Sequence, residues 1–204
     1  LKKAATAIRS DFSILLLGIV QSLFEGSMCV FIFWWTPIIT ASVPEFRTTD
    51  TYIHGIIFSM FMLSITMGST LFSKLSEIMS HAKILVTLLL VATVALSVPI
   101  FTARETLLLP AFFLFEACCG LYFPTMASLR STVLPAELRS TIMSLFRVGL
   151  NLLAILALRF SASHLGPAAF SLCCVWLIMA AVIMAFGFPN ISPPTEAIPT
   201  RIVH

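Results

Sequence analysis

The stretches FEACCGLYFP (residues 115–124) and SLFRVGLN (residues 144–151) decide the fold of this chain. Each is strongly apolar, yet Glu116 lies inside the first and Arg147 inside the second. An ionised side chain at the centre of a membrane helix costs roughly 3 kcal/mol or more, so such groups line a polar pathway or pair with each other. The two stretches therefore predict a membrane protein with a buried polar site.

The composition agrees with a chain that spans a lipid bilayer. Of the 204 residues, 59% are apolar and 10% are charged, and the mean hydropathy is +1.04. An ordinary soluble domain has about 25% charged residues, so this chain has too few charges to cover itself in water. The net charge of +3 is small and no basic run with interleaved aromatics occurs, so no nucleic-acid partner is expected.

Apolar runs of about 20 residues can cross the hydrocarbon core as helices. Six such spans occur, at about residues 14–35, 53–72, 84–101, 107–128, 141–162 and 168–188. The first is expected to stop at Pro37. Residues 1–13 are predicted to be a cytosolic linker and residues 189–204 a disordered cytosolic tail. The predicted fold class is an all-α membrane protein with six transmembrane helices.

Basic residues indicate the orientation, because cytosolic loops retain Lys and Arg. One side has Lys2, Lys3, Arg9, Lys74, Lys83, Arg130, Arg139 and Arg201, whereas the other has Arg47 and Arg104, with Arg159 near a helix end. This distribution places both termini of the segment in the cytosol, in a multi-pass protein of the plasma membrane. The sequon at Asn190 would then be cytosolic and unmodified.

Cysteine and histidine give no sign of a metal site or cofactor. Every cysteine lies inside an apolar run, as expected for small residues that pack between helices: Cys29, Cys118, Cys119, Cys173 and Cys174. The four histidines are scattered without ligand spacing. No Gly-x-Ser-x-Gly or His-Glu-x-x-His motif occurs, so we expect no enzyme, no metal and no cofactor.

The fifth span has a polar stripe. Ser140, Ser144, Arg147 and Asn151 are spaced four, three and four residues apart, which places them on one helix face. The planar guanidinium offers five N–H donors in a fixed fork, which suits the oxygens of a tetrahedral dianion. We interpret Arg147, Asn151 and Ser144 as substrate-binding residues. Two alternatives remain: Arg147 pairs with a helix end or gate, or its side chain reaches the headgroups.

Two carboxyl groups lie near the middle of their spans, Glu25 in the first and Glu116 in the fourth. Gln21 lies one turn before Glu25 on the same face and is assigned to substrate binding as well. Two ionised carboxylates would repel a dianion, so at least one should be neutral or paired. One could compensate Arg147 and the other carry a proton, which would couple anion uptake to proton uptake. Alternatively, both only hold the bundle together.

Gly120 and Pro124 follow Glu116 on the fourth span. Pro removes a helix hydrogen bond and Gly permits close approach, so a kink there could re-aim Glu116. The alternative is that both residue types are simply frequent in membrane helices. Tyr122 and the neighbouring phenylalanines are interpreted as lipid-facing or packing residues.

Two loops resemble those of the major facilitator superfamily. LPAELR (residues 134–139) is similar to the Pro-x-Glu-x-Arg link between its tenth and eleventh helices, and Gly68 with the charges after it resembles an eroded copy of the loop between helices eight and nine. The resemblance implies the C-terminal half of a twelve-helix fold, completed by a missing N-terminal six-helix half. It also implies a cytosolic gate formed by Lys74, Glu77, Glu137 and Arg139. A solvated loop is the alternative.

Further stretches are more specific: LLLGIVQSLFE (residues 15–25), FWWTP (residues 33–37), and residues 116–124 with Phe146 and Arg147. They resemble the second half of the molybdate-anion transporter family. The resemblance implies secondary active uptake of molybdate, a tetrahedral oxyanion, with proton coupling as a hypothesis. Another small anion such as sulfate, or a non-transporting sensor or scaffold with the same fold, is the alternative. The first residue, Leu1, and the lysines after it look like the middle of a loop, so we expect a piece of a longer polypeptide.

Overall fold

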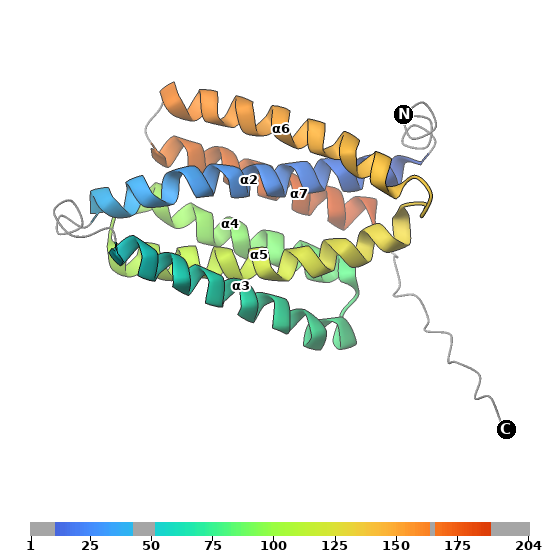
Figure 1. Cartoon of the computed structure of the whole chain (residues 1–204), viewed down its shortest axis with the longest axis horizontal. Coiled ribbons are helices and arrows are strands. Elements are labelled where there is room, and N and C mark those ends of the chain that lie inside the picture. The colour runs from blue at the N-terminus through green and yellow to red at the C-terminus, as the bar shows by residue number, and fades with distance from the viewer. Residues whose placement is uncertain (1–10, 43–51, 164–165, 189–204) are drawn as a thin grey trace.

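The protein is a bundle of six α-helices (Figure 1). The computed structural model describes residues 11–42, 52–163 and 166–188, and these residues form no strand. The helices are α2 (Phe12–Ser42), α3 (Tyr52–Ile78), α4 (His81–Phe101), α5 (Glu105–Val133), α6 (Arg139–Ser163) and α7 (Gly166–Gly187). All six are long and apolar enough to cross a membrane. The predicted all-α membrane fold is confirmed, whereas residues 1–10 of the linker and residues 189–204 of the tail lie outside the described residues.

The first helix is longer than the sequence predicted. It continues through Pro37 to Ser42, so the expectation that it stops at Pro37 is wrong. Pro37 cannot donate to the carbonyl one turn earlier, but in lipid any break in a helix leaves further backbone groups without partners. Continuing the helix is therefore the better solution, and the Ser42 hydroxyl donates to the Ile38 carbonyl beyond the proline at 2.8 Å.

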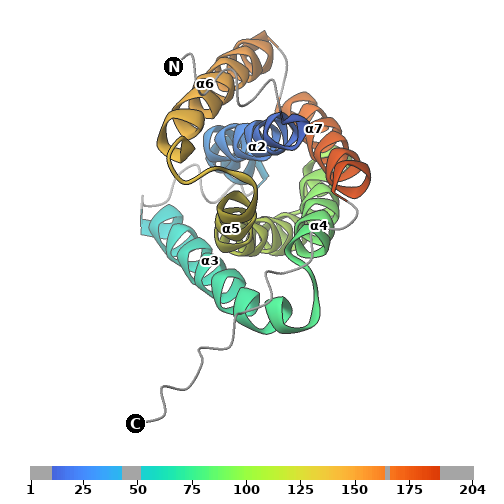
Figure 2. The same ribbon diagram turned by 90° about the vertical axis from the view of Figure 1, so that its right-hand side faces the viewer.

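The two helices that carry Glu25 and Glu116 lie at the centre of the bundle. Figure 2 shows α2 and α5 in the middle, with α6, α7, α4 and α3 arranged around them. α2 packs against α6 and α7, and α5 packs against α3 and α4. α3 and α6 lie at the periphery of the bundle. Within the 18-residue apolar segment of each helix, only 17% of α3 and 11% of α6 is buried. Large faces of these two helices thus lack a protein partner among the described residues.

An aromatic core joins α2 to α5. The Phe24 ring stacks on the Tyr122 ring with centroids 4.0 Å apart. One helical repeat further on, Phe31 meets the edge of Phe112 at 5.1 Å and tilts against Phe115 at 4.9 Å. All five side chains are fully buried, so these aromatic residues of α5 pack inside the bundle.

α3 and α5 approach each other at two glycines. A Cβ atom on Gly68 would overlap the carbonyl oxygen of Ala117, and one on Gly120 would overlap the carbonyl oxygen of Ile65. Small residues of this kind let membrane helices cross in backbone contact. α5 continues as a helix through Gly120 and Pro124, and the predicted kink at these residues stays a prediction.

The cysteines behave as packing residues. All five are free thiols, and Cys118, Cys119 and Cys173 are buried. The Cys174 thiol lies 3.6 Å from the Thr93 carbonyl oxygen, between α7 and α4. The buried thiols and Cys174 agree with the expected packing role, which stays a prediction for Cys29.

Candidate functional site

Four polar side chains meet across the seam between α2 and α5. The Tyr122 hydroxyl donates to Oε1 of Glu25 at 3.2 Å, and Nη1 of Arg130 donates to Oε1 of Gln21 at 3.3 Å. We call these four residues, Gln21, Glu25, Tyr122 and Arg130, the polar ladder. It links the two central helices of the bundle through side chains alone.

The positions of these residues follow from helix geometry. Gln21 and Glu25 are four residues apart on α2 and therefore share one face. Arg130 lies in the last turn of α5, eight residues after Tyr122. Side chains of a helix tilt toward its N-terminus, so the long Arg130 side chain reaches back along α5 toward Gln21. The guanidinium of Arg130, at the C-terminal end of α5, therefore lies between α2 and α5.

The four residues of the polar ladder differ in how deeply they are buried. Gln21 is 5% exposed and Tyr122 is fully buried, whereas Glu25 and Arg130 are half-buried. The bond to Gln21 uses one of the five N–H donors of the guanidinium. Among the described residues its other donors make no hydrogen bond, and a half-buried cation held by a buried amide is suited to holding an oxyanion.

Burial is the largest influence on the Glu25 carboxyl group. The hydrogen bond from Tyr122 and the positive charge of Arg130 act next and favour its ionised form, and the charge of Arg147 on α6 makes the smallest contribution. An anion that approached these arginines would compete with the carboxylate for the same charge.

Glu116 has a different environment from Glu25. It is 9% exposed and lies six residues before Tyr122, which is about 9 Å along the α5 axis. Burial is the one influence that acts on its carboxyl group among the residues that the structure describes. The two intramembrane carboxyl groups therefore differ, because one has partners and the other has none in the described ranges.

The polar stripe of α6 lies apart from the polar ladder. Ser140, Ser144, Arg147 and Asn151 are all exposed, and the Ser144 hydroxyl donates to the Ser140 carbonyl along the same helix at 3.0 Å. α6 packs on α2 through the Phe146 ring, which lies over Gly18. Successive residues turn by about 100°, so this contact directs the stripe away from α2. The structure does not bring Arg147, Ser144 or Asn151 into contact with Gln21.

The residues assigned to a gate are at the end of the bundle that holds the α3–α4 and α5–α6 turns (Figure 1). Lys74, Glu77 and Glu137 are exposed. Arg139 is half-buried and donates from Nη2 to the carbonyls of Ser131 at 3.3 Å and Leu134 at 3.5 Å. Its described contacts therefore satisfy carbonyls at the C-terminal end of α5.

Sequence reasoning missed two members of the polar ladder. Arg130 was counted among the basic residues of a loop, and Tyr122 was taken as an ordinary packing aromatic. A partial signal was present for Arg130: Glu116 and Arg130 are fourteen residues apart and so share one side of α5, although Phe123 between them is apolar and exposed.

Comparison with known sequences assigns this bundle to a family. Residues 1–119 match the family described as sugar transporters with 12 transmembrane segments. Molybdate-anion transporter is the name of several curated relatives. The Danio rerio protein is 36% identical over 159 residues, which cover 73% of this chain and 31% of the relative. The Xenopus laevis protein is 33% identical over 198 residues, which cover 91% of this chain and 42% of the relative.

The chain therefore spans less than half the length of these relatives. A third relative with the same name, from Takifugu rubripes, is 35% identical over 159 residues, which cover 73% of this chain and 31% of the relative. No solved structure matches the chain. The matched family, the named relatives and the six membrane-spanning helices agree. The chain belongs to this family of transporters with 12 transmembrane segments, and its described residues form six membrane-spanning helices.

Proposed function

We propose that this chain is the C-terminal half of a secondary transporter that takes up molybdate or a similar tetrahedral oxyanion. The observation that carries the proposal is the half-buried guanidinium of Arg130, held by Gln21 at the central seam. A sugar site needs neutral donors and acceptors, whereas a fixed cation with free N–H donors suits an oxyanion. This chemistry agrees with the name of the relatives and favours an anion over a sugar.

Arg147 supplies the second cation of the proposed site. It acts on Glu25 from α6, and its stripe with Ser144 and Asn151 is exposed in this bundle. Sites in this superfamily form between two six-helix halves. An N-terminal half that covers the α2–α5 seam and the exposed stripe of α6 would enclose the stripe and the polar ladder in one cavity. The chain by itself should not transport.

We assign the two carboxyl groups different roles. Glu25 interacts with Tyr122 and both arginines, so it compensates their charge while the site is empty. Glu116 is buried without a described partner, and a carboxyl group in such a place is most easily accommodated in its neutral form. Glu116 is therefore the proton carrier of the proposed coupling between anion and proton uptake.

The orientation and the gate belong to the same proposal. Among described residues, the end with the α3–α4 and α5–α6 turns has the basic residues Lys74, Lys83, Arg130 and Arg139, and the opposite end has Arg104 and Arg159. This excess supports a cytosolic location for the former end, and the plasma membrane is the proposed location of the transporter. Lys74, Glu77 and Glu137 are exposed there and can contact the other half when the cytosolic side closes.

Uptake of radiolabelled molybdate tests this function. The full-length protein that contains this chain is expressed in cells, and wild type is compared with Arg130→Gln and Arg147→Gln at equal surface expression. Arg159→Gln is the matched control, because Arg159 is an exposed arginine near the far end of α6. Losing a charge-assisted hydrogen bond costs about 1.5–3 kcal/mol, so each test variant should lose at least about tenfold in uptake.

Competition with sulfate identifies the anion. If sulfate suppresses molybdate uptake at equal concentration, the substrate class is oxyanion in general rather than molybdate. Wild-type uptake together with unchanged uptake in both test variants would reject the arginine site. No uptake by the wild type would instead favour a sensor or scaffold that retains the fold.

A further inference from the structure

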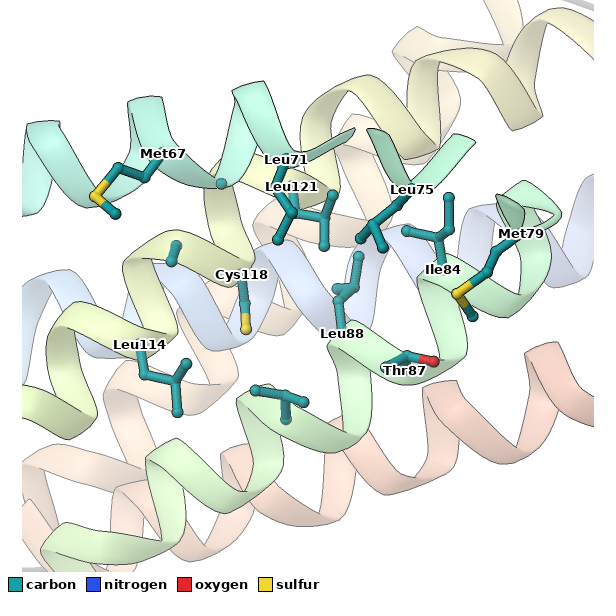
Figure 3. Close-up of a pocket in the computed structure, with 13 residues that line it drawn as sticks. Met67, Leu71, Leu75, Met79, Ile84, Thr87, Leu88, Leu114, Cys118 and Leu121 are labelled. Atoms are coloured by element: carbon teal, nitrogen blue, oxygen red, sulfur yellow. The ribbon is translucent and has the colours of Figure 1, made fainter. Parts of the chain in front are cut away.

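An apolar groove lies between α3, α4 and α5 (Figure 3). Its volume is about 400 Å³. Met67 and Leu71 of α3, Leu88 and Val91 of α4, and Leu121 of α5 are among its lining residues. α3 and α4 are consecutive in the chain but make little contact with each other, whereas both pack on α5. The groove is the space left between them.

The lining of the groove matches hydrocarbon. Thr87 is the one lining residue with a side-chain hydroxyl, and Figure 3 shows it near Ile84 and Leu88 on α4. The remaining lining side chains are aliphatic or contain sulfur. Because the three helices span a membrane, a groove between poorly packed spans is filled by lipid chains rather than water. Apolar lining alone does not distinguish one lipid from another.

Two lysines near the groove favour a lipid with an anionic headgroup. Lys74 lies two turns after Met67 on α3, and Lys83 lies one turn before Thr87 on α4. Helix periodicity therefore places both near the helix faces that line the groove, beyond its end at the α3–α4 turn. Both are exposed. Glu77 follows Lys74 by three residues, which turns it about 60° further from the groove-lining face of α3 than Lys74.

We propose that this groove binds an anionic phospholipid. One acyl chain lies along Leu71, Leu88 and Leu121, and the headgroup, which has a net negative charge, lies between Lys74 and Lys83. The ammonium groups act as point charges toward that net charge, and the lipid fills the gap that the short α3–α4 turn leaves between the two helices. This inference rests on the membrane-spanning fold and not on the proposed transport of an anion.

Headgroup selectivity gives the first test. The detergent-purified full-length protein is titrated with phosphatidylserine or phosphatidylcholine of identical acyl chains, and bound lipids are counted by native mass spectrometry. Each lysine near an anionic headgroup contributes about fivefold in affinity. Wild type should therefore prefer phosphatidylserine by roughly 25-fold, and the double variant Lys74→Gln/Lys83→Gln should lose most of this preference.

The control removes two cations from the opposite end of the bundle, as Arg104→Gln/Arg159→Gln. It should keep the preference for phosphatidylserine. Equal binding of both lipids to wild type, or a preserved preference in the lysine variant, would overturn the proposal. A preference lost equally in both double variants would also overturn it, because net charge rather than this site would then select the lipid.

The groove itself is tested by filling it. Leu71 is 46% exposed and lines the groove, whereas Leu90 of α4 is 50% exposed and is not among the lining residues. Leu71→Trp should displace one tightly bound phosphatidylserine, and Leu90→Trp should displace none. If Leu71→Trp retained the same number of bound lipids as Leu90→Trp, the headgroup would bind without a chain in the groove, and the proposed site would be wrong.

Discussion

The hydroxyl of Tyr122 lies 3.2 Å from Oε1 of Glu25 and donates a hydrogen bond to it. The same tyrosine ring stacks on Phe24 at 4.0 Å, one residue before Glu25 in the chain. A single side chain of α5 thus contacts α2 through both its apolar face and its polar end. Together with the Phe31 contacts to Phe112 and Phe115, this tyrosine holds the two helices together.

Replacing Tyr122 with Phe isolates the polar part of that contact. The ring stack remains, but Glu25 loses a donor. Interhelical hydrogen bonds in membranes are worth about 0.6 kcal/mol on average and up to about 1.7. We therefore expect a loss near 1 kcal/mol, which lowers the Tm in detergent by about 2–4 °C for a chain of this size. Tyr52→Phe is the control, because Tyr52 is 58% exposed. Equal melting of the two variants would show that the bond contributes nothing.

The two carboxyl groups should respond differently when each is made neutral. Glu116→Gln is expected to flatten the pH profile of uptake, since the proposed proton carrier can no longer titrate. Glu25→Gln is expected to keep a pH-dependent profile and to change the apparent affinity for the anion, since the charge facing Arg130 and Arg147 is removed. Initial uptake rates across a pH series measure both effects. Unchanged profiles in the two variants would exclude coupling through these groups.

The glycine crossing between α3 and α5 should resist even one added methyl group. Gly68→Ala and Gly120→Ala each place a Cβ against a backbone carbonyl of the other helix, which cannot move aside as a flexible side chain can. Overpacking of this kind costs about 1–3 kcal/mol. The matched control is Gly55→Ala on α3, where no atom lies within 4 Å of the new Cβ. Thermal unfolding in detergent should show a lower Tm than wild type for Gly68→Ala and Gly120→Ala and an unchanged Tm for Gly55→Ala. Similar Tm values for all three variants would contradict the close crossing.

Cysteine labelling checks the orientation. In a background without the native cysteines, Glu137→Cys reports on the α5–α6 turn and Arg104→Cys on the start of α5, and both positions are exposed. A membrane-impermeant maleimide added to intact cells should label position 104 and should reach position 137 only after permeabilisation. The reverse pattern would invert the proposed orientation.

Hydropathy alone was enough to predict the bundle. Six apolar runs became six helices because lipid requires every backbone group to be paired within its own segment. Helix ends were less predictable: the expected stop at Pro37 relied on a rule from water-soluble proteins, and α2 passes through it. The central position of α2 and α5 depends on packing between distant segments, to which a single sequence gives no direct access.

The candidate site was predicted in part. Glu25, Glu116 and Gln21 stand out because polar groups are rare inside spans, and the structure places all three on the central helices. Arg130 escaped notice because an arginine at a helix end usually reaches toward headgroups, whereas here it points back toward Gln21. For α6, periodicity grouped Arg147 with its polar neighbours correctly but could not tell which neighbour the stripe would face. Phe146 on Gly18 decides that.

The weak packing of α6 has a consequence for how the chain is made. Its apolar window has the lowest hydropathy of the six spans, 1.3, and it contains Arg147. An arginine at a helix centre opposes insertion by the translocon by about 2.5–3.5 kcal/mol. We expect α6 to be the last of these helices to leave the translocon for the bilayer, and to need α2 already in place to do so. Biogenesis of this protein would then be most sensitive to changes at Gly18 and Phe146, where the two helices meet.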